Sequence, residues 1–314
     1  MLEVKIRNIV FKNPILTASG TFGYGLECPE LTDVSKLGAV VTKSVSRKLR
    51  HGNPFQRIAE STGGMLNSIG LANVGIDIFL NEKIPALKVA NATVLVNIAA
   101  SSIEEYCYLI ERCEELNDGV AGYEINVSCP NVKDGGLNFG TNCNSVGEIT
   151  KSVRKLTDKF ISIKLTPNVT SVSEFAIVCE SEGADAVTCC NTFLGMAIDS
   201  KSRKPKLATI TGGYSGPAIK PMALAKVYEV RKATKIPIIG SGGIMCVEDA
   251  LEFLIVGASL IELGTALFVD PNLGSKIIIG IEDYLIANSF ESVNDLIGSL
   301  DTTMQPSLVA SGWS

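Results

Sequence analysis

Short apolar segments and amphipathic segments alternate along almost the whole chain. The apolar segments are continuous rather than alternating with polar residues, which is typical of parallel strands buried on both faces. Eight of them are candidate strands, and they cover residues 15–18, 39–42, 94–98, 123–127, 161–165, 186–190, 236–240 and 260–264.

The amphipathic segments are predicted to be helices, because most follow a residue that favours a helix start. Serines precede the first three, and a proline opens the fourth. The expected helices are 103–116, 146–157, 172–182, 221–234, 247–256 and 272–288. This alternation predicts an α/β fold, namely a (β/α)8 TIM barrel, with a Rossmann-type sheet as the alternative.

Two connections are too long for ordinary loops between a strand and the next helix. They cover residues 44–72 after the second strand and 191–220 after the sixth. Insertions of this length in a compact domain are commonly lids or binding loops. We also expect an N-terminal hairpin below the barrel over residues 1–13, with Asn8 near its turn. Residues 1–314 are expected to form a single barrel domain, with 301–314 as a poorly ordered tail.

Composition narrows the classes of function. The chain has 314 residues, a net charge of −5 and a pI of about 5.2, which argues against nucleic-acid or polybasic membrane binding. The most apolar stretch, 250–269, contains Glu252 and Glu262, so we expect barrel material and no membrane span. A single histidine, His51, excludes a cluster of histidine metal ligands, and we expect no metal on this chain. Nine cysteines without a C-x-x-C motif fit a reducing cytoplasm.

Polar side chains stand where nearly every predicted strand ends, and in a barrel these positions meet at one mouth. Lys43 and Lys164 each end an apolar strand; they could extend from the rim to solvent, or compensate an anionic cofactor and substrate. The other polar side chains at strand ends are Ser19, Ser44, Asn97, Asn126, Ser128, Asn191 and Thr192. We therefore predict a binding site at this mouth.

Glycines after the seventh and eighth strands indicate a phosphate site. Gly242 and Gly243 follow one strand, and Gly264 with Thr265 follows the other. Such loops let backbone amides approach a phosphate, and these two loops are the usual phosphate site of barrels. Met245 stands where a dinucleotide fingerprint requires glycine, so a mononucleotide fits better than NAD.

Cys129 leaves the fourth strand at the mouth, in the sequence NVSCPN of residues 126–131. A cysteine is most often a small buried hydrophobe, and we interpret the other eight in that way or as isolated loop thiols. The position of Cys129, with Pro130 fixing the turn after it, makes this thiol the candidate general base.

Several motifs together resemble the dihydroorotate dehydrogenases of pyrimidine biosynthesis. They are NVSCPNVKDGG at 126–136, NSIGL at 67–71, GGYSGP at 212–217, KLTPN at 164–168 and SGGI at 241–244. The resemblance covers about residues 1–298. The continuation VKDGG is similar to the NAD-linked class 1B catalytic subunit rather than the fumarate-linked class 1A enzyme.

The resemblance implies a set of site residues. FMN would place its phosphate on Gly242, Gly243, Gly264 and Thr265, with backbone near Gly216. The flavin ring would meet Ser19, Lys43, Ser44, Asn97, Asn126, Lys164 and Cys190, where an aliphatic residue is expected in place of Cys190. The pyrimidine would contact Lys43, Asn67, Ser68, Ile69, Gly70, Leu71, Asn126, Asn191 and Thr192.

The implied reaction is oxidation of dihydroorotate to orotate, with Cys129 removing a proton from C5 while C6 delivers hydride to FMN. The class 1B resemblance implies that electrons then pass to NAD through a partner subunit carrying FAD and a [2Fe-2S] cluster. The expected assembly is a heterotetramer of two catalytic and two electron-transfer subunits around a homodimer.

Three alternatives remain open at this point. One is a homodimeric class 1A enzyme that uses fumarate, and another is a flavin-free barrel lyase or isomerase acting on a phosphorylated substrate. The third is a non-catalytic barrel that serves as a scaffold, which the set of Lys43, Asn67, Asn126, Cys129 and Lys164 disfavours.

Overall fold

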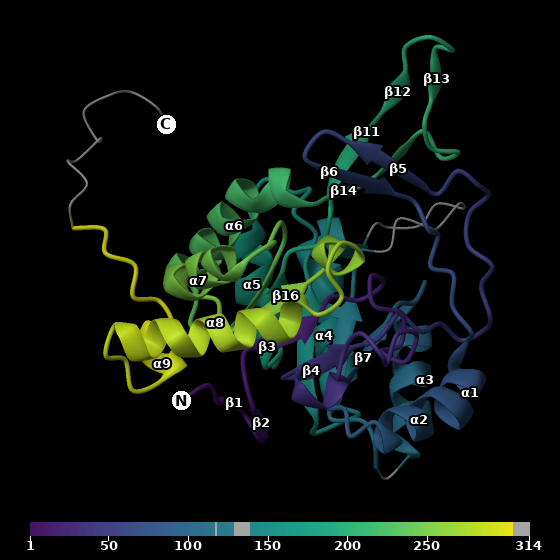
Figure 1. The fold of residues 1–314 in the computed structure, drawn as a ribbon. Coiled ribbons are helices and arrows are strands. Elements are labelled where there is room, and N and C mark those ends of the chain that lie inside the picture. Colours follow the sequence, from purple (N-terminus) through teal and green to yellow (C-terminus); the bar gives the residue numbers. More distant parts are fainter. Residues whose placement is uncertain (117, 129–138, 304–314) are drawn as a thin grey trace.

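A closed barrel of eight parallel strands forms the centre of the molecule in this computed structural model, which describes residues 1–116, 118–128 and 139–303 (Figure 1). Each predicted strand overlaps an observed one, so the predicted barrel is confirmed and the Rossmann alternative is wrong. The barrel strands are β3 (Ile15–Thr17), β4 (Ala39–Val41), β7 (Val94–Ile98), β8 (Gly122–Asn126), β9 (Phe160–Lys164), β10 (Ala186–Cys189), β15 (Ile238–Ser241) and β16 (Leu260–Leu263).

The strands pair in chain order, and β16 closes the barrel by pairing with β3, with Ile261 opposite Ile15. Nearly every residue of these strands is buried, including several polar ones. Burial on both faces explains why the strands appear in the sequence as continuous apolar runs, because one face packs inside the barrel and the other against helices.

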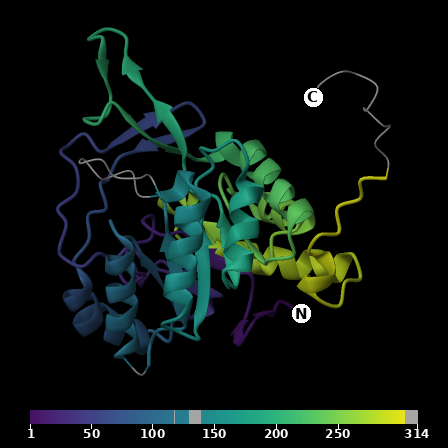
Figure 2. The same cartoon turned by 180° about the vertical axis from the view of Figure 1, so that it is seen from behind.

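Helices surround the barrel, and Figure 2 shows α4, α5 and α6 lying side by side on one flank. Five of the six long helices begin within a residue of the predicted start. The exception is the helix predicted over residues 146–157, which begins at Cys143. The Asn142 side chain accepts a hydrogen bond from the Ser145 amide and caps the helix at this earlier position. The long helices are α3 (Ile103–Glu114), α4 (Cys143–Arg154), α5 (Val172–Ser181), α6 (Lys220–Ala233), α7 (Val247–Val256) and α8 (Leu273–Ala287).

The first two barrel units depart from the regular pattern. Only a 3-10 turn, η1 (Val34–Lys36), lies between β3 and β4. After β4 and its insertion comes a helical segment that the sequence analysis did not identify, made of α1 (Ile76–Ile78), the π-helical turn η2 (Phe79–Lys83) and α2 (Ile84–Val89). The remaining short helical elements are η3 (Phe139–Thr141), η4 (Pro217–Ile219), η5 (Thr265–Phe268) and α9 (Val293–Leu296).

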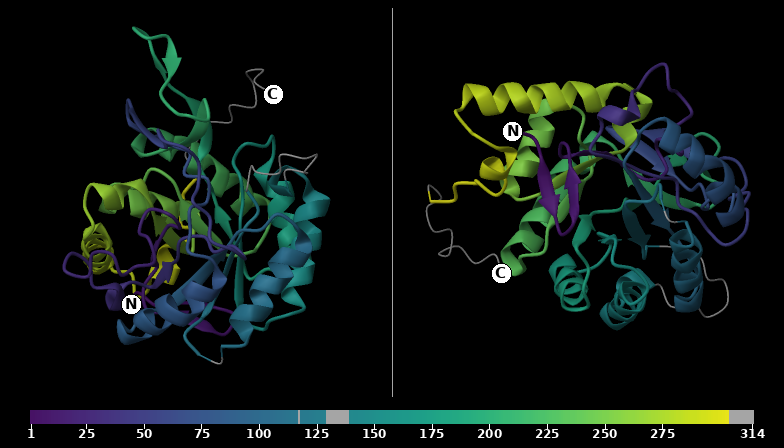
Figure 3. Two further views of the ribbon diagram at one scale, coloured as in Figure 1. Left: turned by 90° about the vertical axis from the view of Figure 1, so that its right-hand side faces the viewer. Right: turned by 90° about the horizontal axis from the view of Figure 1, so that it is seen from below.

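The two long insertions do not form separate loops. They contribute strands to one antiparallel sheet above the barrel, which we call the insertion sheet, in the order β11, β14, β6, β5. A hairpin of β12 and β13 projects beyond it (Figures 1 and 3). The strands are β5 (Ile58–Ser61), β6 (Gly64–Asn67), β11 (Phe193–Met196), β12 (Ile198–Asp199), β13 (Lys204–Pro205) and β14 (Thr211–Ser215).

The expected N-terminal hairpin is present as β1 (Val4–Ile6) and β2 (Ile9–Phe11). Its turn contains Arg7 and Asn8, with Arg7 at a φ of 54°. Viewed from below, the hairpin lies under the barrel (right panel of Figure 3). Phe11 is fully buried there and its ring meets Phe160 edge-on, 5.5 Å between centroids. The hairpin therefore covers the bottom of the barrel, opposite the predicted mouth.

At the other end of the chain, 301–303 are exposed, and residues 304–314 of the predicted tail lie outside the described residues. In the part of the chain that is described, no helix is both long and apolar enough to cross a bilayer.

Candidate active site

A cavity of about 700 Å³ opens at the carboxyl ends of the barrel strands, between the barrel mouth and the insertion sheet. Its size and its mixture of apolar and polar walls are typical of cofactor and ligand sites. The structure brings nearly all the predicted site residues together in this one cavity. They are Ser19, Lys43, Ser44, Asn67, Ser68, Ile69, Gly70, Leu71, Asn126, Lys164, Cys190, Asn191, Thr192, Gly216, Gly242, Gly243, Gly264 and Thr265.

Two predicted residues do not fall in this group. Cys129 lies outside the described residues, and the described residue before it, Ser128, lines the cavity. Asn97 is fully buried behind the wall and is not a lining residue. Its side-chain amide donates to Glu124 Oε1 at 2.6 Å, so it supports the cavity floor from within the barrel.

Charged side chains inside the barrel form the floor. Lys164 Nζ donates to Glu262 Oε2 at 2.8 Å and to Glu124 Oε1 at 3.3 Å, and the lysine side chain is only 7% exposed. Burial by itself would lower the pKa of Lys164, but the two carboxyls raise it above its usual value. Lys164 is therefore an ammonium at neutral pH. Glu262 shares the cavity floor with it, and Glu124 lies beneath.

Neither Glu124 nor Glu262 is among the site residues predicted from the sequence. Glu124 lies within a predicted strand, and Glu262 served only as an argument against a membrane span. Each is a single charge inside an otherwise apolar strand, and such a charge is rarely buried without a partner. That signal could have marked them as interior residues, although not as partners of Lys164.

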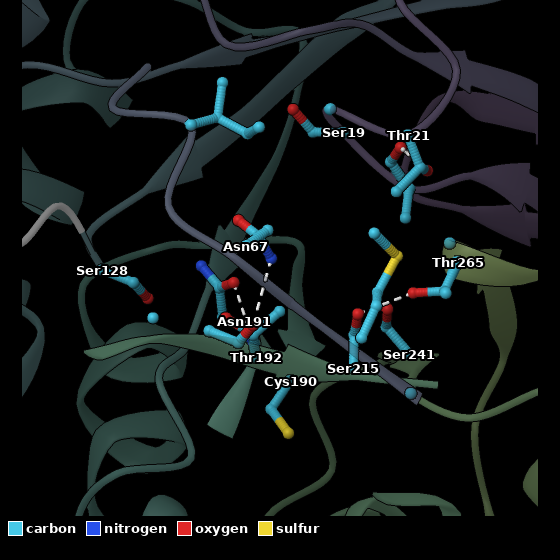
Figure 4. Close-up of a pocket in the computed structure, with 18 of the residues that line it drawn as sticks. Ser19, Thr21, Asn67, Ser128, Cys190, Asn191, Thr192, Ser215, Ser241 and Thr265 are labelled. Atoms are coloured by element: carbon cyan, nitrogen blue, oxygen red, sulfur yellow. Dashed lines mark hydrogen bonds between the residues drawn. The ribbon is translucent and has the colours of Figure 1, made fainter. Parts of the chain in front are cut away.

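Glycine loops and hydroxyls form one side of the cavity. Gly242 and Gly243 follow β15 with φ values of 134° and 77°, in the region that favours glycine. A Cβ on Gly243 would lie 2.6 Å from the amide nitrogen of Lys220, so no side chain fits there. Across the loop after β16, Thr265 Oγ1 donates to Ser215 Oγ at 2.7 Å, and Figure 4 shows the two facing each other.

The backbone amides of Gly243 and Ile244 have no hydrogen-bond acceptor among the described residues. Both residues line the cavity. Amides in a glycine loop that lack a protein acceptor can bind the oxygens of a phosphate. This side of the cavity therefore has the donor set of a phosphate site.

Asparagines gather on the opposite side (Figure 4). Asn126 Oδ1 accepts from the Ser128 amide at 3.1 Å and from Asn191 Nδ2 at 3.5 Å. Asn67 Nδ2 donates to the carbonyl of Gly213 at 3.3 Å, across the insertion sheet. Because each amide side chain offers both a donor and an acceptor, this group can pair with the ring amides of a heterocycle.

A further asparagine, Asn168, was part of the KLTPN motif but was not predicted as a site residue. It lines the cavity, donates to the Thr192 carbonyl at 3.1 Å and accepts from the Leu194 amide at 2.8 Å. Asn168 thus ties the loop after β9 to the start of β11. Only the three-dimensional contact between these segments identifies this role.

All eight cysteines in the described part of the chain are free thiols. Cys190 is buried, lines the cavity and donates its amide to the Ser241 carbonyl at 3.1 Å. Burial raises the pKa of the Cys113 and Cys179 thiols to about 12, so both are neutral. Among the described residues, no group of three or more His, Cys, Asp or Glu could hold a metal ion.

The family model and two relatives that match this chain are all described as dihydroorotate dehydrogenases. The family model described as dihydroorotate dehydrogenase matches residues 1–285. A relative from Geotalea daltonii, named dihydroorotate dehydrogenase B (NAD(+)), catalytic subunit, is 51% identical over 299 residues, covering 95% of this chain and 98% of the relative. A relative of the same name from Parabacteroides distasonis is 48% identical over 300 residues, covering 96% and 98%.

Among solved structures, a crystal structure of DHODH in complex with ferulenol from Eimeria tenella has a TM-score of 0.78 to this chain. It is 22% identical and covers 95% of this chain and 88% of that chain. At this identity the match supports the barrel fold alone.

Proposed function

This chain belongs to the dihydroorotate dehydrogenase family, and we propose that it oxidises dihydroorotate to orotate in pyrimidine biosynthesis, with FMN bound in the cavity at the barrel mouth. The observation that carries the proposal is the composition of that cavity. A glycine-rich phosphate side, a buried ammonium and a group of asparagines converge in one space of about 700 Å³.

The residues fit FMN. We assign the phosphate to the loops of Gly242–Gly243 and Gly264–Thr265, because the amides of Gly243 and Ile244 lack protein acceptors in the described chain and a side chain at Gly243 would clash. We assign Lys164 to the flavin ring, because its ammonium at the cavity floor can compensate the negative charge of a reduced flavin. Ser19, Lys43, Ser44, Asn97, Asn126, Cys190 and Gly216 complete the assigned set, with Asn97 acting through Glu124.

For the substrate, we assign the asparagine group and the loop of residues 67–71. Lys43 would offset the substrate carboxylate. Gly70 and Leu71 have φ values of 72° and 57°, and a Cβ on Gly70 would lie 2.6 Å from the Asn53 amide nitrogen. Asn53 Nδ2 also donates to the Ser68 carbonyl at 3.0 Å. These contacts hold the loop against the cavity, which positions Asn67 for binding.

Bound FMN supplies the acceptor for the hydride that leaves C6 of dihydroorotate. The chain must supply a base for the proton at C5, and we assign this role to the thiolate of Cys129, which receives that proton as the C5–C6 double bond forms. Sequence position supports the assignment, because Cys129 directly follows the cavity residue Ser128. A positioned base of this kind contributes about 10²–10⁴-fold to the rate.

We further propose that a partner subunit carries FAD and a [2Fe-2S] cluster and passes the electrons to NAD, in a heterotetramer of two subunits of each kind. The names of the relatives, which specify NAD(+) and a catalytic subunit, support this proposal. We also propose that the complex is cytoplasmic, because the eight described cysteines are all free thiols.

Cys129→Ala tests the assigned base. The variant should keep its FMN, while the rate of anaerobic flavin bleaching by dihydroorotate falls by about 10²–10⁴-fold. Cys28→Ala, which removes an exposed free thiol, is the matched control and should bleach at the wild-type rate. Normal bleaching by Cys129→Ala would exclude the thiolate as the base.

The electron acceptor needs a separate measurement. The isolated chain should reduce little NAD with dihydroorotate, and adding the electron-transfer subunit should restore NAD reduction. Rapid turnover of the isolated chain with fumarate would instead assign it to class 1A.

A further inference from the structure

Three charged side chains meet in the barrel interior beneath the cavity, and we call Lys164, Glu124 and Glu262 the buried triad. They come from β9, β8 and β16, and both glutamate side chains are fully buried. Two carboxyls therefore face one ammonium. If both carboxyls were ionised, the triad would carry an uncompensated negative charge in a low-dielectric interior, which is strongly disfavoured.

The two carboxyls differ in the number of donors they receive. Glu124 accepts from Asn97 Nδ2 at 2.6 Å, from Thr188 Oγ1 at 2.8 Å and from Lys164. Glu262 accepts from Lys164 at 2.8 Å, and its other oxygen, Oε1, is buried without a hydrogen-bond donor in the described part of the chain. Hydrogen bonds to a carboxylate favour its ionised form. Glu124 is therefore the carboxyl that is built to be ionised.

The direction of each pKa agrees with this difference. Burial raises the pKa of Glu262 well above its usual value, and the neighbouring charge of Glu124 raises it further. Burial also opposes ionisation of Glu124, but Lys164 and the donors around it outweigh that effect and lower its pKa. An un-ionised Glu262 can donate its proton, and it then adds no second negative charge next to Glu124, whereas two ionised carboxylates can only accept.

We propose that Glu124 and Glu262 share a single proton, held by Glu262, and that this neutral triad is the positioning device that keeps Lys164 charged at the cavity floor. The charged groups that act on Glu262 are Glu124 on β8 and Lys164 on β9, and Lys43 lines the same cavity. Asn97 on β7 and Thr188 on β10 act on Glu262 indirectly, because both donate hydrogen bonds to Glu124.

The consequence for the cofactor rests on the proposed function. A reduced flavin is anionic, and a second ionised carboxylate in the floor would repel it. With Glu262 protonated, Lys164 presents a positive charge whose counter-ion, Glu124, lies below the floor and accepts from three donors. The triad thus provides a cation at the cavity floor without placing a negative charge in the cavity wall.

The shared proton can be observed directly by infrared spectroscopy of the full chain, with FMN bound and after its removal. At about pH 8, ordinary carboxyls are ionised and an un-ionised carboxylic acid gives a separate carbonyl band. The wild type should show this band. Glu262→Gln should lose it, and Glu124→Gln should also lose it, because the remaining carboxyl ionises to balance Lys164.

Glu114→Gln is the matched control. Glu114 is a partly buried glutamate whose lowered pKa keeps it ionised, held by Tyr123 and Thr157, so this variant should retain the acid band. Absence of the band from the wild type, or its persistence in Glu262→Gln, would overturn the proposal. Because the band is also measured without FMN, a chain that binds no flavin would refute the proposed function while still deciding the question of the proton.

The positioning role needs a second readout, the dissociation constant of FMN as a function of pH. The double variant Glu124→Gln/Glu262→Gln leaves Lys164 buried without a counter-ion, so its pKa falls and it loses its charge as pH rises. We expect FMN to bind about tenfold more weakly or worse at about pH 8 and to recover affinity toward acid pH. Glu262→Gln alone should show a smaller loss. A double variant with unchanged, pH-independent affinity would exclude the positioning role.

Discussion

Replacing the ammonium of Lys164 with an apolar side chain should destabilise the barrel in a manner that depends on pH. Lys164→Met keeps an unbranched side chain of similar length and removes the ammonium, with its charge and its hydrogen bonds. The variant leaves Glu124 without its counter-ion, although Asn97 and Thr188 still donate to it. The lost contacts are the two from Lys164 Nζ, at 2.8 Å to Glu262 and 3.3 Å to Glu124.

At the 3.3 Å between Lys164 Nζ and Glu124 Oε1 and an effective dielectric constant of about 20, this ion pair has a gross Coulomb energy of about 5 kcal/mol, and desolvation offsets much of it. Removing one partner of a buried pair costs about 3–5 kcal/mol. We therefore expect the free energy of unfolding of Lys164→Met to fall by about 3–5 kcal/mol near neutral pH.

The sign of the pH dependence follows from Glu124. Without Lys164 its pKa in the folded state rises above the unfolded value of about 4.3, so the folded variant binds one proton more than the unfolded chain. Its stability is then present at low pH and is lost as pH rises through the raised pKa. Relative to wild type, the deficit should shrink by about 1.4 kcal/mol for each pH unit below the raised pKa.

The assay is urea unfolding of both proteins at about pH 8 and about pH 5.5, followed by circular dichroism. The double variant Lys164→Met/Glu124→Gln is the matched rescue, because it removes the unbalanced charge and leaves Glu262 neutral. It should recover most of the stability at the higher pH. A deficit that does not change with pH, or a double variant no more stable than Lys164→Met, would show that the unbalanced charge of Glu124 does not cause the loss of stability.

Three further predictions concern the proposed ligands. Gly243→Ala should lower the melting temperature and weaken FMN binding, because the new Cβ would lie 2.6 Å from the Lys220 amide nitrogen and residue 243 has a φ of 77°. Unchanged FMN affinity in a fluorescence titration would contradict the assignment of the phosphate to this loop. Thr265→Val removes the hydrogen bond to Ser215, worth about 1 kcal/mol, so FMN affinity should fall about fivefold, and no change would exclude a role for this contact. Asn67→Ala should raise the KM for dihydroorotate about tenfold while FMN is retained, and a variant that loses FMN instead would place Asn67 on the cofactor.

The barrel could be predicted from the sequence because its strands are buried on both faces and therefore appear as uninterrupted apolar runs. The insertion sheet could not be predicted in this way. Its strand β5 is mostly exposed, and β14 begins with Thr211 and two glycines, so neither has an apolar pattern. These strands are stabilised by pairing between segments far apart in the chain, such as Gly213 opposite Asn67. No local pattern contains that information.

The cavity residues could be predicted for a related reason. A barrel brings the ends of all its strands to one mouth, so polar residues at strand ends become neighbours without knowledge of the register. Predicting the buried triad would have required the register of the barrel strands. Asn97 pairs with Glu124 and Asn126 with Lys164, while Glu262 reaches Lys164 across the barrel interior from β16. Helix α4 also began earlier than predicted, because an asparagine cap and a serine cap cannot be ranked from the sequence.

A dihydroorotate dehydrogenase with its cofactor site at the barrel mouth must bind FMN and reduce it with dihydroorotate. The most direct test is the visible absorption spectrum of the purified full-length chain, recorded before and after anaerobic addition of dihydroorotate. We predict a yellow protein whose flavin band bleaches when the substrate is added. A protein that remains colourless after incubation with FMN would exclude the FMN site, and a flavin band unchanged by dihydroorotate would exclude the proposed reaction.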